Sequence, residues 1–216
     1  PGTTTAIIGS TGCGKSTLVN LIPRFFDVTE GSITLDGRDI RNITLESLRE
    51  NIGYVPQKGI LFSGTIADNI KYGQLVESDE DMLEAAEIAQ ATEFIEAKPD
   101  KYESQVAQGG NNVSGGQKQR VAIARMLMQQ APVMIFDDSL SAVDAETDEK
   151  IRTALRHSTG KATVLLISHR VTTLMQADRI LVLDGGRVAE LGTHAQLVEK
   201  LSLIHISEPT RHSLIS

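Results

Sequence analysis

A glycine-rich stretch near the start of the chain, Gly9–Ser16, constrains the fold more than any other feature. Its sequence, GSTGCGKS, fits the phosphate-binding loop pattern G-x-x-x-x-G-K-[ST]. The apolar run Ala6–Ile8 before it predicts a buried strand, and Ser16–Ile22 predicts a helix that Pro23 ends. Such a loop directs unpaired backbone N–H groups and the positive end of the helix dipole at an anion. The stretch therefore predicts a nucleotide-binding α/β protein.

Each part of this loop has an expected role. Glycine lets the backbone approach the phosphates, which a side chain would block. Lys15 is expected to hold the β- and γ-phosphates, Ser16 to bind Mg²⁺, and Thr17 to reach the α-phosphate. The alternative, an ordinary glycine-rich turn before a helix, does not require that lysine and serine. The predicted ATP-binding residues are Gly9, Ser10, Thr11, Gly12, Cys13, Gly14, Lys15, Ser16 and Thr17.

The composition is that of a soluble globular protein. The 216 residues are 40% hydrophobic and 23% charged, enough for one substantial core with a subsidiary lobe. A net charge of −7 gives no broad basic surface, so no nucleic-acid partner is expected. The single cysteine, Cys13, excludes an internal disulfide and a cysteine-only metal cluster. No apolar run approaches the ~20 residues that cross a bilayer, and no signal peptide is visible.

Both ends look unlike the ends of a complete domain. Pro1 lies only a few residues before the phosphate loop, as though an upstream part were cut away. The sequence LSLIHISEPTR, residues 201–211, resembles translated sequencing-library adapter; a genuine short apolar tail is the alternative. We assign residues 1–200 to one domain and expect residues 201–216 to be a non-native tail.

Later apolar runs predict further strands. Val133–Phe136 is unbroken, which is typical of a parallel strand covered on both faces, and Thr163–Ile167 predicts a second such strand. Ile52–Val55 also predicts a strand, Ser32–Gly37 a short one, and residues 180–191 a hairpin. Because helical segments separate most of these strands, the sequence predicts a parallel α/β sheet.

The middle of the chain, residues 74–130, carries no strand signal and predicts a separate helical lobe. Apolar residues recur at helical intervals within residues 79–97, which predicts one helix packed by one face. Three pairs have the spacing of a capping box: Thr65 with Asp68, Ser78 with Asp81, and Thr193 with Gln196.

Two further motifs carry chemistry. Asp137 ends the strand Val133–Phe136, at the edge of a parallel sheet where ligands bind, and is expected to hold Mg²⁺ through water. A turn or helix cap is the alternative for Asp137. The sequence Ser114–Gln117, SGGQ, precedes a predicted helix at Lys118–Gln129. Alone it could be a turn followed by a capped helix, but with the other two motifs it becomes specific.

These motifs, in this order, resemble those of the nucleotide-binding domain of ATP-binding-cassette (ABC) proteins. The resemblance covers residues 3–200, and Val113 replaces the leucine of the usual L-S-G-G-Q signature. It implies a P-loop NTPase with a RecA-like parallel-sheet core and an α-helical signature subdomain inserted at residues 74–130. It also implies an N-terminal antiparallel β part, which is largely missing here.

The resemblance assigns the remaining site residues. Gln57 matches the glutamine that contacts Mg²⁺ and the coupling helix of the membrane domain, and His169 matches the histidine at the γ-phosphate. Ser141–Asp144 matches the loop that crosses to the partner; Asp144 could also cap the next helix. The implied catalytic residues are Asp138, His169 and Gln57; the metal residues are Ser16, Gln57 and Asp137; the partner-ATP contacts are Ser114, Gly115, Gly116, Gln117 and Asp144.

The resemblance also implies a mechanism. Two such domains pack head to tail around two ATP molecules with Mg²⁺, and the signature of each faces the phosphate loop of the other. Closure and hydrolysis then drive the membrane domains of a transporter. The implied partners are a second nucleotide-binding domain and a transmembrane domain at the cytoplasmic face of the membrane.

Three departures from the family pattern stand out. Asp138 replaces the usual glutamate that polarises the attacking water; its shorter carboxylate resembles the degenerate site of heterodimeric exporters. Gln108 stands where a glutamate is common. The aromatic residue that stacks on adenine would lie upstream of Pro1, and Phe25, Phe26 and Tyr54 do not occupy its position.

Three functions are compatible with these features. Phe62–Ile70 resembles exporter rather than importer sequence, which favours the ATPase domain of an exporter. A soluble ABC ATPase of DNA repair or translation would carry a long coiled coil or a basic insertion, and the sequence shows neither. A regulatory module with little hydrolysis is permitted by Asp138 but disfavoured by Lys15, Asp137 and His169.

Overall fold

The fold is built on a six-stranded sheet with the strand order β10-β9-β1-β8-β7-β4. The computed structural model describes residues 2–73, 78–158, 160 and 162–199. All neighbouring strands are parallel except β10, which pairs antiparallel with β9. The strands are β1 (Thr4–Gly9), β4 (Ile52–Val55), β7 (Val133–Asp137), β8 (Thr163–Ile167), β9 (Arg179–Asp184) and β10 (Arg187–Gly192). The predicted parallel sheet and the predicted hairpin are confirmed.

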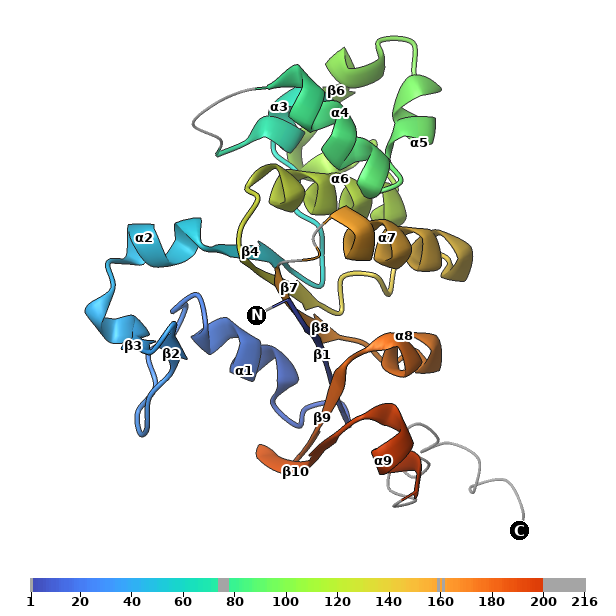
Figure 1. The fold of residues 1–216 in the computed structure, drawn as a ribbon. Helices are drawn as coiled ribbons and strands as arrows, with labels where there is room; N and C mark the ends of the chain where they lie inside the picture. The colour runs from blue at the N-terminus through green and yellow to red at the C-terminus, as the bar shows by residue number, and fades with distance from the viewer. Residues whose placement is uncertain (1, 74–77, 159, 161, 200–216) are drawn as a thin grey trace.

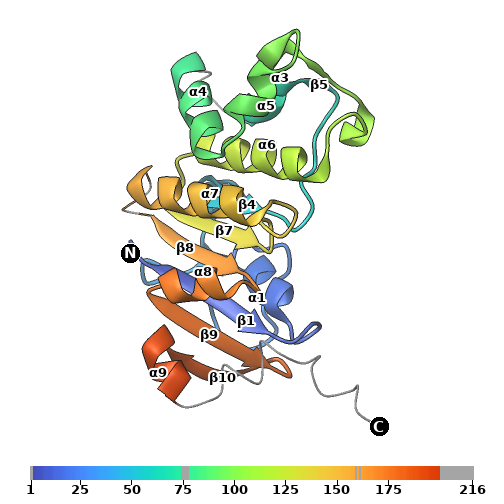
Figure 2. The same ribbon diagram turned by 90° about the vertical axis from the view of Figure 1, so that its right-hand side faces the viewer.

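Helices cover both faces of this sheet (Figures 1 and 2). On one face, α1 (Lys15–Leu21) packs on alternate strand residues, among them Ile7, Ile135 and Ile167. On the other face, α6 (Gly115–Met128) and α7 (Ala145–Ser158) pack on Met134 and Phe136. Farther along that face, α8 (Val171–Gln176) and α9 (His194–Glu199) cover Ala6, Ile8 and the inner residues of β9. Burial on both faces explains the unbroken apolar runs.

The helical lobe stands at one end of the sheet (Figure 2). It contains α4 (Asp79–Ile88) and α5 (Thr92–Glu96) and also α3 (Ile66–Lys71), which precedes the predicted bounds of 74–130; α6 contacts both α3 and α4. The expectation of no strand in this region was wrong, because β6 (Gln105–Val106) pairs antiparallel with β5 (Gly64–Thr65). A pairing two residues long leaves no periodic signal in the sequence.

The single helix predicted at residues 79–97 was also wrong. The chain turns after α4, where Gln90 has φ 55° and the N–H of Ala91 donates to the carbonyl of Ala86 at 2.7 Å. Helix α5 then begins at Thr92. Buried alanines continue through the break, so the apolar spacing of the sequence hides it.

The predicted caps are largely confirmed. Thr65 and Asp68 form a complete capping box, and the Thr193–Gln196 pair exchanges both bonds. At Ser78, the side chain accepts from the N–H of Asp81. Residues 201–216, the expected non-native tail, lie outside the described residues. Within the described ranges, no helix is both long and apolar enough to cross a membrane.

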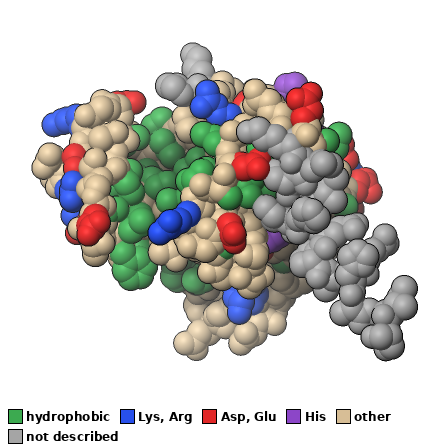
Figure 3. Space-filling view, turned by 90° about the horizontal axis from the view of Figure 1, so that it is seen from below, with side chains coloured by type: hydrophobic (Ala, Val, Ile, Leu, Met, Phe, Trp, Pro, Cys, Tyr) green, Lys and Arg blue, Asp and Glu red, His purple; other side chains and the backbone are tan. Residues whose placement is uncertain are grey.

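A short strand pair and α2 (Leu45–Glu50) lie beside α1 (Figure 1). The strand expected at residues 32–37 is shorter, with β2 (Thr34–Leu35) turning at Gly37 (φ 78°) into β3 (Arg38–Asp39). A 3-10 turn at Ile40–Asn42 follows, and two more lie at Lys101–Glu103 and Gln108–Gly110. When the molecule is seen from below, hydrophobic side chains are visible across the middle of its surface (Figure 3).

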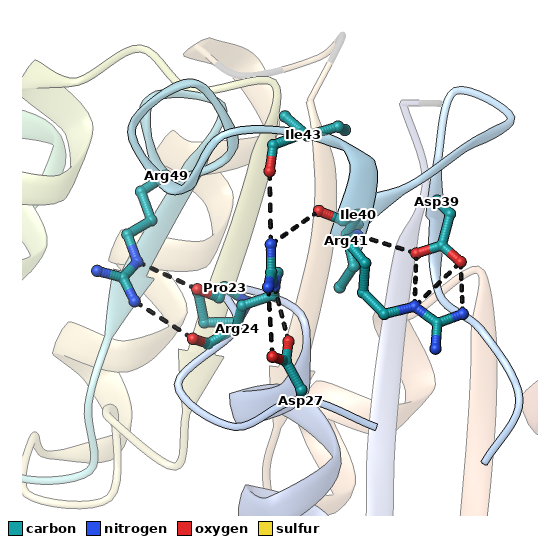
Figure 4. A network of polar contacts seen from close by, with 8 residues as sticks. All are labelled: Pro23, Arg24, Asp27, Asp39, Ile40, Arg41, Ile43 and Arg49. Atoms are coloured by element: carbon teal, nitrogen blue, oxygen red, sulfur yellow. Dashed lines mark hydrogen bonds and ion pairs between the residues drawn. The ribbon is translucent and has the colours of Figure 1, made fainter. Parts of the chain in front are cut away.

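Arginines fasten this region to the end of α1 (Figure 4). Arg24 pairs with Asp27 at 2.8 Å and also donates to two backbone carbonyls after β3. Arg49 of α2 donates to the carbonyls of Pro23 and Arg24. Arg41 hydrogen-bonds to Asp39 and lowers the pKa of that carboxyl to about 2. The strand pair and α2 are thereby held against the loop that follows α1.

Candidate functional site

The phosphate loop lies at the carboxyl edge of β1 and requires glycine. A side chain on Gly9 would place its first carbon 2.2 Å from the carbonyl oxygen of Leu183 in the neighbouring β9. Gly12 and Gly14 have φ of 81° and 101°, in the region that favours glycine. A carbon added to Gly12 would meet nothing within 4 Å, so the space above the loop is open. The loop is shaped to let a ligand approach its backbone.

Lys15 is buried at the centre of this loop. Its Nζ donates to the carbonyls of Gly9 at 2.8 Å and Ser10 at 2.9 Å. The ammonium group is therefore held over the loop, where it would face the phosphates of a nucleotide. Cys13 is buried in the apolar cluster between α1 and the sheet (the α1 cluster), which includes Ile7, Val19, Ile135 and Ile167. Thr11, Ser16 and Thr17 are exposed around the loop.

Ser16 and Asp137, predicted from motifs 121 residues apart, meet in the structure. The Ser16 hydroxyl donates to Oδ1 of Asp137 at 2.8 Å. Asp137 is buried at the end of β7, beside the start of α1. A hydroxyl and a carboxylate next to a phosphate site are the oxygen ligands that Mg²⁺ prefers, so the residues present fit that ion.

Tyr54 is a neighbour of Asp137 that the sequence analysis missed. Its hydroxyl lies 3.0 Å from Oδ2 of Asp137 and 2.8 Å from Oδ1 of Asn20. Burial raises the pKa of the phenol, and the charge of Asp137 raises it further. The phenol therefore stays protonated and can donate. The alternation in Ile52–Val55 placed Tyr54 on the same strand face as Ile52, but nothing in it pointed to Asp137.

The structure also brings Gln57 and Asp138 together. Nε2 of Gln57 donates to Oδ2 of Asp138 at 3.1 Å. Asp138 has φ 48°, and its carbonyl accepts from both the N–H and the hydroxyl of Ser141. His169 is exposed just after β8, which lies between β1 and β7, so it lies at the same carboxyl edge.

The signature residues begin α6. Ser114 and Gln117 form a complete capping box, with bonds of 3.3 and 3.2 Å. A side chain on Gly116 would approach the carbonyl of Ala142 to 3.0 Å, so this first turn lies against the loop Ser141–Asp144. Ser114 and Gly115 are exposed, on the side of the sheet opposite α1.

Comparison with known families agrees with this geometry. The profile of the ABC transporter family matches residues 1–141. The chain belongs to the ABC transporter family. Its α/β fold, with a parallel sheet at its core, matches that of an ABC exporter: it superposes on a bacterial Atm1-family ABC exporter with ATP bound, with a TM-score of 0.92 and 42% identity, over 95% of this chain and 36% of that chain.

Relatives of this ABC domain include several exporters. An uncharacterized ABC transporter ATP-binding protein of Mycobacterium tuberculosis is 47% identical over 92% of this chain and 34% of its own length. An ATP-dependent lipid A-core flippase of Thiobacillus denitrificans is 45% identical over 93% of this chain and 35% of its own. A putative multidrug export ATP-binding/permease protein of Staphylococcus aureus is 44% identical, over 92% and 34%. The chain spans about one third of the length of these relatives.

Asp144 caps α7 in this ABC domain. Its Oδ1 accepts from the N–H of Thr147 at 2.9 Å, and this hydrogen bond lowers the pKa of the carboxyl. The capping role that the sequence left open for Asp144 is therefore confirmed. The cap fixes the direction in which the loop enters the helix.

Gln119 is a second residue that the sequence analysis missed. It is buried in α6, and its Nε2 lies within hydrogen-bond distance of the carbonyls of Pro56, Gln57 and Ser139, the nearest at 2.7 Å. It thus connects the signature helix to the segments that carry Gln57 and Asp138. A polar residue on the apolar face of α6 was the available signal.

Proposed function

We propose that this chain binds ATP with Mg²⁺ and hydrolyses it to power export by an ABC transporter. The observation that carries the proposal is the pair Ser16–Asp137 beside Lys15, under an open glycine loop. A bound nucleotide would bring three phosphates and their charge to this edge of the sheet. Lysine, hydroxyl and carboxylate are the groups that hold such phosphates and their metal ion.

The remaining site residues take roles around that nucleotide. Gln57 and Asp138 would contact the magnesium ion and the attacking water, and His169 the γ-phosphate. Support comes from their places: Gln57 and Asp138 share a hydrogen bond, and His169 follows a strand that pairs with both β1 and β7. Aligned groups of this kind act mainly by positioning the water and stabilising charge.

A second nucleotide-binding domain would complete the site. Ser114, Gly115, Gly116 and Gln117 start a helix on the face of the sheet opposite α1, away from the chain's own α1 cluster. This placement supports a head-to-tail pair in which these residues and Asp144 meet the ATP of the partner. The exposed start of α6 would present backbone N–H groups to that phosphate.

The membrane partner is inferred from the relatives. Because the chain spans about a third of their length, the remainder of such a protein has room for a membrane domain. We place this domain, residues 1–200 with the helical lobe at 74–130, at the cytoplasmic face of the membrane. ATP-driven pairing would then be transmitted to the membrane domain.

Lys15→Ala tests the proposal. The substitution removes the only side-chain charge that the motif places inside the loop, so ATP binding and ATP-induced pairing of the domains should both be lost. Lys150→Ala is the matched control, since Lys150 is exposed on α7 and paired with Glu146. Nucleotide affinity and light scattering with and without ATP report the two steps. Pairing of the Lys15→Ala variant on ATP would refute the proposed function.

We further propose that the chain's own site hydrolyses ATP slowly and that the partner supplies a glutamate, as in a heterodimer. The side chain of Asp138 is one methylene shorter than glutamate, and misplacing the water by about an ångström can cost ~100-fold in rate. Asp138→Glu should therefore raise turnover in the assembled dimer. Unchanged turnover with normal ATP binding would remove the slow-site assignment, and an absence of hydrolysis in both proteins would favour a regulatory module.

A further inference from the structure

A buried carboxylate in the first turn of α7 joins two arginines from different parts of the chain. The side chain of Asp148 is 1% exposed. Arg152, one turn along α7, donates to its Oδ1 at 3.1 Å, and Arg170, which precedes α8, donates to its Oδ2 at 2.9 Å. A charge buried this deeply requires its partners, because nothing else replaces the lost water. Asp148 therefore fixes where both guanidinium groups lie.

Arg170, unlike Arg152, also contacts the loop that precedes α7. Its Nη2 donates to the carbonyl of Val143 at 2.6 Å. Val143 precedes Asp144, and Arg170 follows His169 directly. One rigid, planar guanidinium thus bridges the loop that carries Asp144 and the segment that carries His169.

The backbone around Arg170 is also held in place. Its N–H donates to the hydroxyl of Ser168 at 3.2 Å, and its carbonyl accepts from the N–H groups of Thr173 and Leu174 in α8. Because Arg170 is bonded at both ends, a displacement of the Ser141–Asp144 loop would also displace the backbone next to His169.

We propose that Arg170 is a positioning residue that couples His169 to the Ser141–Asp144 loop. Contact of a partner domain with Asp144 would then set the place of His169 at this chain's own nucleotide. The inference rests on the proposed function and deepens it, because it names the side chain through which the two nucleotide sites communicate. Coupling of this kind is carried by discrete contacts between elements with defined arrangements.

Arg170 can be removed without leaving Asp148 unpaired. Its side chain is 30% exposed, and the buried carboxylate would keep Arg152 as a counter-ion. Arg152 is a structural residue. Its side chain is 7% exposed, and its Nη1 donates to Oε1 of Gln176 at 2.7 Å. A variant at Arg170 is therefore expected to fold and to lose chiefly the link between the two segments.

The test is a double-mutant cycle in the chain assembled with its partner domains. Arg170→Met should lower kcat about 10-fold, as expected for a misplaced catalytic group, and leave ATP affinity unchanged because the Lys15 loop is untouched. Asp144→Ala should also lower kcat. If Arg170 acts through the loop, the double variant should be no slower than the slower single variant, so the two effects do not multiply. Arg170→Lys, which cannot bridge both acceptors, should lie between wild type and Arg170→Met.

Lys150→Met is the control, because it removes an exposed ion pair on α7, the helix that carries Asp148; it should retain wild-type kcat and combine multiplicatively with Asp144→Ala. Wild-type kcat in Arg170→Met, or full multiplication of its effect with that of Asp144→Ala, would overturn the inference while leaving the proposed function intact. Failure of the wild-type chain to pair on ATP would instead refute the proposed function and the inference with it. If Arg170→Met does not fold, Arg170→Lys carries the same cycle.

Discussion

At the scale of single residues, the carboxylate of Asp137 is shared between two hydroxyl groups. Ser16 donates to one oxygen and Tyr54 lies 3.0 Å from the other. A tyrosine is already protonated at physiological pH, and burial raises the pKa of this phenol further, so Tyr54 remains a donor. Its hydrogen bond would turn the carboxylate so that the oxygen beside Ser16 faces the metal position. Removing a group that orients a metal ligand in this way typically lowers metal affinity by about 10- to 100-fold.

Tyr54→Phe should therefore weaken metal binding. The ring and its edge-to-face packing on Phe25 would remain, but the donor to Asp137 would be lost. We expect the affinity for Mn²⁺, measured by electron paramagnetic resonance with a non-hydrolysable ATP analogue, to fall about 10-fold. Tyr72→Phe in the helical lobe is the control and should not change it. Equal Mn²⁺ affinity in Tyr54→Phe and wild type would show that Ser16 suffices to orient the carboxylate.

The sequence predicted Ser16 and Asp137 because each belongs to a motif or strand end whose place in a parallel sheet is known. Tyr54 could not be predicted in the same way. Its contact depends on the register in which β4 pairs with β7, where Tyr54 lies opposite Ile135, two residues before Asp137. That register is set by packing between segments far apart in the chain, and no local pattern encodes it.

At the scale of helices and strands, the turn between α4 and α5 contains a strained residue. Gln90 has φ 55°, a conformation that costs a side-chain-bearing residue energy and glycine almost none. Gln90→Gly should therefore raise the free energy of unfolding by about 0.5 kcal/mol, after the loss of its side-chain bond to the carbonyl of Glu87 is included. Urea unfolding measures the change.

The matched control lies in α4, the helix that precedes this turn. Glu84 is exposed within α4, so Glu84→Gly should lower the free energy of unfolding by about 1 kcal/mol. Opposite signs for the two glycine substitutions would show that the chain turns at Gln90. A loss of stability in both variants would instead support the continuous helix that the sequence favoured. The capping pairs at Thr65 and Thr193 were read correctly because a cap is a local signal, whereas this break is not.

At the scale of the whole molecule, the sequence predicted a parallel sheet but not the order of its strands. Strand β1 lies between β8 and β9, the last parallel strands to be synthesised, and β4 forms the edge. This order places β8, which His169 follows, between β1 with its phosphate loop and β7 with Asp137. The helical lobe was also anticipated, but the polar part of its attachment to the sheet was not. Besides the apolar packing of α6 on Met134 and Phe136, Gln119 donates to backbone carbonyls rather than to a recognisable motif partner.

Gln119→Glu tests whether this one side chain joins the lobe to the sheet. The substitution keeps the shape but replaces the donor that faces the carbonyls of Gln57 and Ser139 with an acceptor, so the buried carbonyl of Ser139 and the partly buried one of Gln57 lose their partner. We expect the free energy of unfolding to fall by about 2 kcal/mol. Amide exchange should speed up more in α3 and α4 than in β1 and β8, because the lobe is then held less firmly. Gln105→Glu, at an exposed position of β6, should change stability by no more than about 0.5 kcal/mol. Uniform acceleration of exchange across lobe and sheet would mean that Gln119 stabilises the molecule as a whole rather than this junction.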